Sequence, residues 1–226
     1  MILMRILVAC EESQAVCIAF REKGHEAFSC DLQPCSGGHP EWHLQMDVLE
    51  ALVQWEGEFD MMIGHPVCRY LANSGVQHLY NKDGSINNER WELMKQAAAF
   101  FLKLYNAPIP KIAIENPIMH KHAKEIIGIK QTQIIQPWMF GHPEQKATCL
   151  WLKGLPKLFP TSTSLECQNN RTYSKMMKLP KRERESGYFM RHHLQTVRSS
   201  VQKPSPESRR PWQISGASPS DQNHNQ

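Results

Sequence analysis

Short apolar runs recur along the chain and alternate with segments of helical periodicity. Each run has the length of a buried strand and ends near a polar or turn residue. The predicted strands cover residues 5–8, 25–30, 59–63, 111–114, 132–136 and 147–152, and a short strand or turn ends at Asp47. The predicted helices cover residues 13–23, 48–54, 88–105 and 119–127. This alternation predicts an open α/β fold, a mostly parallel sheet with helices on both faces.

The clearest helical pattern begins at Asn88 and ends at Tyr105. Its apolar residues are Trp91, Met94, Ala98, Phe101, Leu102 and Tyr105. For the first helix, Ser13 is the expected N-cap and Gly24 is the expected stop signal. Two polar segments, residues 32–45 and 69–87, are predicted to be loops.

Composition divides the chain into three regions. Residues 1–160 hold every predicted strand and helix, residues 161–198 form a short basic region, and residues 199–226 are a polar tail that we expect to be disordered. No stretch approaches about 18 uninterrupted apolar residues, so no membrane span is expected. The apolar N-terminus is interrupted by Arg5 and predicts a first strand rather than a signal peptide. Cysteines in a chain without an export signal favour free thiols in a reducing compartment.

Charge is distributed unevenly. Residues 1–145 carry 12 Lys and Arg against 17 Asp and Glu, a net charge of −5, and residues 146–226 carry 14 against 5, a net charge of +9. A basic C-terminal third fits a polyanionic partner. The alternative is a basic disordered tail that binds nothing.

Chemically versatile side chains gather at the predicted strand ends. These positions are Ala9, Asp31, Asp47, Pro66, Cys68 and Glu115. Because ligands of open α/β sheets bind beyond the carboxyl ends of the strands, we expect these residues to share a site.

An acid after the second strand can accept hydrogen bonds from both hydroxyls of a nucleoside ribose, which is the role expected of Asp31. Asp47 and Val48 could bracket an adenine with one polar and one apolar contact. The first turn, residues 9–13, contains no glycine, so the glycine-rich nucleotide signature is absent. The alternative for Asp31 is a simple cap or turn residue.

Cys68 is the cysteine that follows a Gly-x-Pro turn at a strand end, which favours a nucleophile over a core thiol. Glu115 follows an apolar run, so burial is expected to raise its pKa and let it donate a proton. The alternative for Glu115 is an acid at a helix N-terminus. A structural zinc site at Cys30, Cys35, His39 and His43 is a further alternative, although its spacing is not a common one.

Together these residues resemble the DNA cytosine-5 methyltransferases, in particular the small versions encoded by bacteriophages. Pro66-Val67-Cys68 matches the family's Pro-Pro-Cys loop, and Glu115-Asn116-Pro117 matches its Glu-Asn-Val element. Residues 144–148 correspond to its Gln-x-Arg-x-Arg strand, and residues 140–156 look like the phage subgroup. Order and spacing agree across residues 5–160.

The resemblance implies a Rossmann-like S-adenosylmethionine-dependent methyltransferase fold and methyl transfer to C5 of cytosine in double-stranded DNA. It implies that Cys68 attacks C6 of the ring, that Glu115 holds N3 and the exocyclic amine, and that Lys146 holds the carbonyl oxygen. The implied cofactor-binding residues are Ala9, Cys10, Glu11, Asp31, Leu32, Asp47, Val48 and Pro66. Residues 161–198 would contact DNA. We expect a monomer in the cytoplasm, that of a bacterial host if the chain is phage-encoded.

The chain also departs from the family. Val67 replaces a proline, Lys146 is the one cation left where the family has arginines, and residues 199–226 do not match the family's closing helix. Two other functions therefore remain open. One is a catalytically impaired relative that binds DNA or cofactor, and the other is an enzyme that modifies C5 of a free pyrimidine nucleotide.

Overall fold

A seven-stranded sheet forms the centre of the protein, in the order β3-β2-β1-β4-β5-β7-β6. The computed structural model describes residues 3–142 and 145–161, so the predictions for the basic region and the tail, apart from Thr161, fall outside the described residues. The strands are β1 (Arg5–Ala9), β2 (Glu26–Asp31), β3 (His43–Gln45), β4 (Met61–Gly64), β5 (Lys111–Pro117), β6 (Gln133–Ile135) and β7 (Thr148–Lys153). Neighbours from β3 to β5 are parallel, and β7 runs antiparallel to both β5 and β6. The predicted fold class, an open and mostly parallel α/β sheet, is therefore confirmed.

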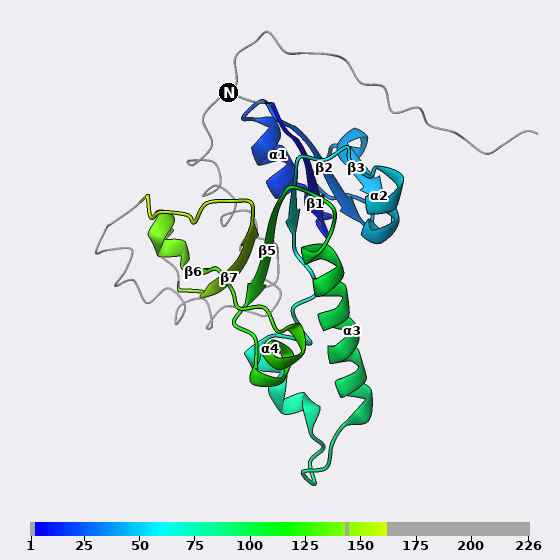
Figure 1. Ribbon diagram of the computed structural model, residues 1–226, viewed down its shortest axis with the longest axis vertical. Coiled ribbons are helices and arrows are strands. Elements are labelled where there is room, and N and C mark those ends of the chain that lie inside the picture. The colour runs from blue at the N-terminus through cyan, green and yellow to red at the C-terminus, as the bar shows by residue number, and fades with distance from the viewer. Residues whose placement is uncertain (1–2, 143–144, 162–226) are drawn as a thin grey trace, which may run out of the picture.

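Successive residues of a strand point to opposite faces of the sheet. Helices cover both of these faces. The α-helices are α1 (Ala15–Arg21), α2 (Val48–Gln54), α3 (Asn88–Tyr105) and α4 (Lys121–Ile127). Short 3₁₀ helices span Pro40–Trp42, Asn73–Leu79 and Pro137–Phe140. Ile6 and Val8 of β1 pack in one cluster with α1, whereas Leu7 packs in a second cluster with α2 and α3. Figure 1 shows α3 extending past the sheet, with α4 beside it.

Several predicted boundaries agree with the structure and others need correction. The helices α2 and α3 have the predicted bounds. The N-cap of helix α1 is Gln14 rather than Ser13, so the helix begins at Ala15. It ends at Arg21 rather than near Lys23. The predicted loops contain β3 and the 3₁₀ helix Asn73–Leu79.

The strand β5 is longer than predicted. It continues through Glu115 to Pro117, because β7 pairs with it in antiparallel register over that whole stretch. Glu115 therefore lies within a strand rather than at the turn after one, and it is not at a helix N-terminus. The carboxyl ends of β4 and β5 point toward α4 and residues 69–87 (Figure 1).

The possible zinc ligands do not come together. Cys30 lies in the core, whereas its neighbour Ser29 points to the other face and bonds His43 Nδ1 at 2.8 Å. The ring of His39 stacks on Trp42. Within residues 3–142 and 145–161, no three His, Cys, Asp or Glu side chains are grouped as a metal site requires.

Of the helices in the described ranges, none is both long enough and apolar enough to cross a membrane.

Candidate active site

The loop that carries Cys68 is attached to both strands beside it. The His65 N–H donates to the Ala9 carbonyl of β1 at 3.0 Å, and Asn116 Nδ2 of β5 donates to the Pro66 carbonyl at 3.3 Å. Gly64 is needed at the start of this loop, since a Cβ there would lie 2.8 Å from Ile114 Cδ1. Strand β4 and its neighbours therefore fix the chain up to Pro66.

Cys68 follows as an exposed residue at the start of a turn. Its carbonyl accepts the N–H groups of Leu71 and Ala72 at 2.9 and 2.8 Å. The turn presents the thiol at the carboxyl edge of the sheet, where the sequence predicts it.

Three predicted catalytic side chains act on one another electrostatically. Desolvation raises the pKa of the Cys68 thiol, the negative charge of Glu115 raises it further, and the positive charge of Lys146 lowers it. The charges of Glu115 and Lys146 therefore both act on the Cys68 thiol, although the three residues come from separate segments. A thiol, a carboxyl group and an ammonium group that act on one another in this way have the chemistry to attack, protonate and polarise a polar ring.

His65 is a fourth functional group at this site, and sequence reasoning did not assign it a role. Its Nδ1 lies 3.5 Å from Glu115 Oε2, and its side chain is only 10% exposed. A histidine between the Gly64 and Pro66 of a strand-end turn is the signal that could have identified it.

The predicted cofactor residues lie at the adjacent ends of β1 and β2. Although the first turn has no glycine, Cys10 and Gln14 adopt the left-handed backbone conformation that glycine favours, with φ of 61° and 57°. A Cβ on Gly37 would lie 2.6 Å from Gln14 Cβ, so the loop after β2 packs directly on this turn. The backbone thus forms a tight turn of the kind that a glycine-rich sequence normally supplies.

Glu11 is buried beneath this turn, with 1% of its surface exposed. Its carboxylate accepts hydrogen bonds from the backbone N–H groups of Val16 and Cys17 at 2.6 and 3.2 Å. These N–H groups lie at the start of α1, where they have no acceptor within the helix. Burial raises the pKa of Glu11, and the nearby charge of His65 opposes that rise. Its side chain therefore lies at the start of α1, where it also feels the charge of His65.

Two acids approach the first turn from β2 and α2. Burial, followed by the charges of Asp31, Cys30 and Asp47, raises the pKa of the Cys10 thiol to about 12. Asp31 Oδ1 accepts the Gln33 N–H at 3.0 Å, and Asp47 Oδ1 caps α2 by accepting the Leu49 N–H at 2.8 Å. Both acids thus also have local structural roles.

The two apolar candidates beside these acids differ sharply in exposure. Leu32 is 71% exposed at the edge of the turn, whereas Val48 is 5% exposed and packs in the core. Ala9 and Pro66 are buried behind the strand ends. Of the apolar predicted residues, Leu32 offers the most surface to a ligand.

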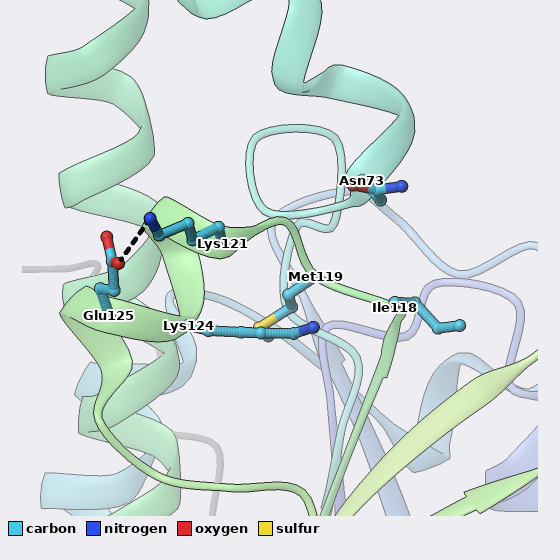
Figure 2. Close-up of a pocket in the computed structure, with 6 residues that line it drawn as sticks. All are labelled: Asn73, Ile118, Met119, Lys121, Lys124 and Glu125. Atoms are coloured by element: carbon cyan, nitrogen blue, oxygen red, sulfur yellow. Dashed lines mark ion pairs between the residues drawn. The ribbon is translucent and has the colours of Figure 1, made fainter.

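A separate pocket of about 500 Å³ lies beyond the end of β5 (Figure 2). Its lining residues are Asn73, Ile118, Met119, Lys121, Lys124 and Glu125, none of which is a predicted site residue. The Asn73 N–H donates to the Ile118 carbonyl at 2.8 Å, which joins the segment after Cys68 to the segment after Glu115. Lys121 pairs with Glu125 at 3.8 Å, as the dashed line in Figure 2 marks.

No family model matches the chain. No curated protein matches it either. Among solved structures, it is similar to Dnmt2 methyltransferase of S. pombe, with 16% identity and a TM-score of 0.44 over 70% of this chain and 52% of that one. It is also similar to the Entamoeba histolytica methyltransferase EhMeth, with 15% identity and a TM-score of 0.48 over 73% and 58%. A third similar structure is a Spodoptera frugiperda DNMT2 mutant, with 14% identity and a TM-score of 0.39 over 71% and 54%. The chain spans about half the length of these structures.

Proposed function

We propose that this protein transfers a methyl group from S-adenosylmethionine to C5 of cytosine in DNA, through a covalent bond between Cys68 and C6 of the ring. The observation that carries the proposal is that the charges of Glu115 and Lys146 both act on the Cys68 thiol, at the carboxyl edge of a mostly parallel α/β sheet. In such sheets this edge is where ligands bind.

The ends of β1 and β2 fit the cofactor. Asp31 is proposed to accept hydrogen bonds from the ribose hydroxyls, and exposed Leu32 to cover one face of the adenine. The left-handed turn at Cys10 lets the backbone of Ala9, Cys10 and Glu11 approach the cofactor closely. Asp47, Val48 and Pro66 complete the proposed binding set. When bound, S-adenosylmethionine supplies an electrophilic methyl group.

The remaining chemistry belongs to the chain's own side chains. A cytosine must leave the base stack before C6 can be reached. The Cys68 thiolate adds to C6, Glu115 holds N3 and the exocyclic amine, and Lys146 holds the carbonyl oxygen. Addition at C6 makes C5 nucleophilic, and loss of the C5 proton with release of the cysteine restores the ring.

In the proposed mechanism, binding of a ring changes the charges around Cys68 in favour of the thiolate. In the free protein Glu115 opposes ionisation of the thiol. A ring nitrogen that bonds the Glu115 carboxyl group reduces this repulsion, while Lys146 continues to favour the thiolate. Substrate binding is therefore expected to activate the nucleophile.

Double-stranded DNA is the proposed partner. The pocket beyond β5 carries Lys121 and Lys124 beside the segment that follows Glu115, where they are suited to phosphate contacts (Figure 2). Residues 161–198 are proposed as a further contact because of their basic composition. A monomeric state and a cytoplasmic location stay predictions.

Covalent trapping tests this mechanism directly. On duplex DNA containing 5-fluorocytosine, the fluorine cannot leave as a proton does, so the adduct should persist in the presence of S-adenosylmethionine. Cys68→Ser should abolish the adduct, whereas the matched control Cys35→Ser, which changes a free cysteine of a different loop, should retain it. An adduct that survives Cys68→Ser would refute the assignment.

The same assay separates the alternative functions. Binding of DNA and cofactor without an adduct or methyl transfer would indicate a catalytically impaired relative. An adduct on a free pyrimidine nucleotide but not on DNA would indicate a nucleotide-modifying enzyme.

A further inference from the structure

His65 is buried at the centre of the site without ordinary hydrogen bonds to its ring. Both ring nitrogens are inaccessible to solvent, and within the described residues neither makes a hydrogen bond of ordinary geometry. Its closest charged contact is Glu115, at 3.5 Å from Nδ1 to Oε2. A buried polar ring whose one charged contact is this long is costly, so a purely structural role would favour an apolar residue here.

The charges that face the ring come from three different elements. Glu115 faces it from β5, Glu11 from the turn before α1, and Lys146 from the segment before β7. Burial lowers the pKa of His65, but the two carboxyl groups outweigh burial and Lys146, so the pKa is raised overall. The imidazole therefore feels the charge of two carboxyl groups, one of which holds the substrate in the proposed function.

We propose that His65 is a positioning residue that stores a proton and delivers it to Glu115. This inference rests on the proposed function, because it assigns the origin of the proton that Glu115 presents to the cytosine ring. It extends that function to a residue that the resemblance does not supply.

The proton transfer is balanced. The Nδ1–H bond of the imidazolium breaks as Glu115 Oε2 takes the proton, which leaves a neutral imidazole and a neutral carboxylic acid. Glu115 then gives this proton to N3 of the ring while Cys68 adds to C6. When the cysteine leaves, N3 returns the proton to Glu115, and His65 recovers it, so that no proton is gained or lost along this path.

Imidazole nitrogen NMR on the full chain, without DNA or cofactor, tests the stored proton. The His65 signal is assigned by its loss in His65→Gln, with His65→Asn as a second variant should the first not fold. It should titrate at a higher pH than an unperturbed histidine and move to lower pH in Glu115→Gln. His25 is the internal control, since burial lowers its pKa and it bonds the Met4 N–H away from this site. A His65 signal that is unchanged by Glu115→Gln would overturn the proposal.

A kinetic measurement tests the delivery of the proton. General acid catalysis typically contributes about 10²–10⁴-fold, so His65→Gln should lower the single-turnover methylation rate by about 10²-fold at neutral pH while DNA affinity is unchanged. The loss should shrink at lower pH, where Glu115 protonates from solvent. An equal loss at every pH would overturn the delivery role. If the wild type methylates no DNA, the proposed function fails, and the NMR titration still decides whether His65 and Glu115 share a proton.

Discussion

Asn116 gives the sharpest test of how the fold positions the nucleophile. It is fully buried, and its Nδ2 donates to the Pro66 carbonyl, which joins β5 to the Cys68 loop. Asn116→Ala removes this hydrogen bond and leaves the Pro66 carbonyl short of a partner, which costs about 1–3 kcal/mol if that group stays buried. We therefore expect the free energy of unfolding to fall by about 2 kcal/mol, measured by urea denaturation.

The same substitution should change the chemistry of Cys68 in two opposite ways. A released loop carries the thiol away from Glu115 and into water, so its pKa should fall and its alkylation at neutral pH should become faster. Methyl transfer should become slower by about 10²-fold, because a displacement of about 1 Å can cost that much in rate. Mass spectrometry of the Cys68 peptide separates this thiol from the other cysteines.

A matched control separates loop release from general destabilisation. Ala98→Gly in α3 changes a fully buried helix residue in the core and should cost about 1 kcal/mol through helix propensity, with a further loss from the missing methyl group. It should leave the alkylation rate of Cys68 unchanged. Asn116→Ala could lower stability and yet leave both the alkylation rate of Cys68 and the rate of methyl transfer unchanged. In that case the loop is held by its other contacts and the reasoning fails.

Three further predictions concern single side chains of the site. Asp31→Ala should weaken S-adenosylmethionine binding by about 1–3 kcal/mol in calorimetry, and unchanged affinity with an intact fold would remove Asp31 from the cofactor site. Glu115→Gln removes a charge that raises the pKa of Cys68, so the pH profile of Cys68 alkylation should shift to lower pH, and an unshifted profile would contradict the charge coupling. Val67 is 50% exposed, and Val67→Pro should raise the single-turnover rate by stiffening the loop without changing the methylated sequence context. Equal rates would mean that the loop is already ordered by its neighbours.

The sequence was sufficient to predict helices whose first residue is set by a neighbouring cap residue. Asp47 and Asn87 accept backbone N–H groups of α2 and α3, and such caps are visible as residue types directly before a helical pattern. The alternation of strands and helices was enough to predict the parallel sheet and the edge where Cys68 lies.

The features that sequence reasoning missed depend on contacts between distant segments. The extension of β5 past Glu115 requires the pairing with β7, which lies more than thirty residues later in the chain. The left-handed backbone at Cys10 and Gln14 is not visible from residue types, because neither is a glycine, and the Gly37 loop packs on Gln14 from a distant position in the chain. The charges of Glu11 and Glu115 raise the pKa of His65, and neither residue is close to it in sequence.

Methylation of unmodified duplex DNA with labelled S-adenosylmethionine tests the central claim most directly. The DNA is digested to nucleosides and the labelled base is identified, with wild type, Cys68→Ser and Cys35→Ser run in parallel. We predict label in 5-methylcytosine for the wild type and for Cys35→Ser, and none for Cys68→Ser. Label in any other base, or label in 5-methylcytosine that survives Cys68→Ser, would contradict the proposed function.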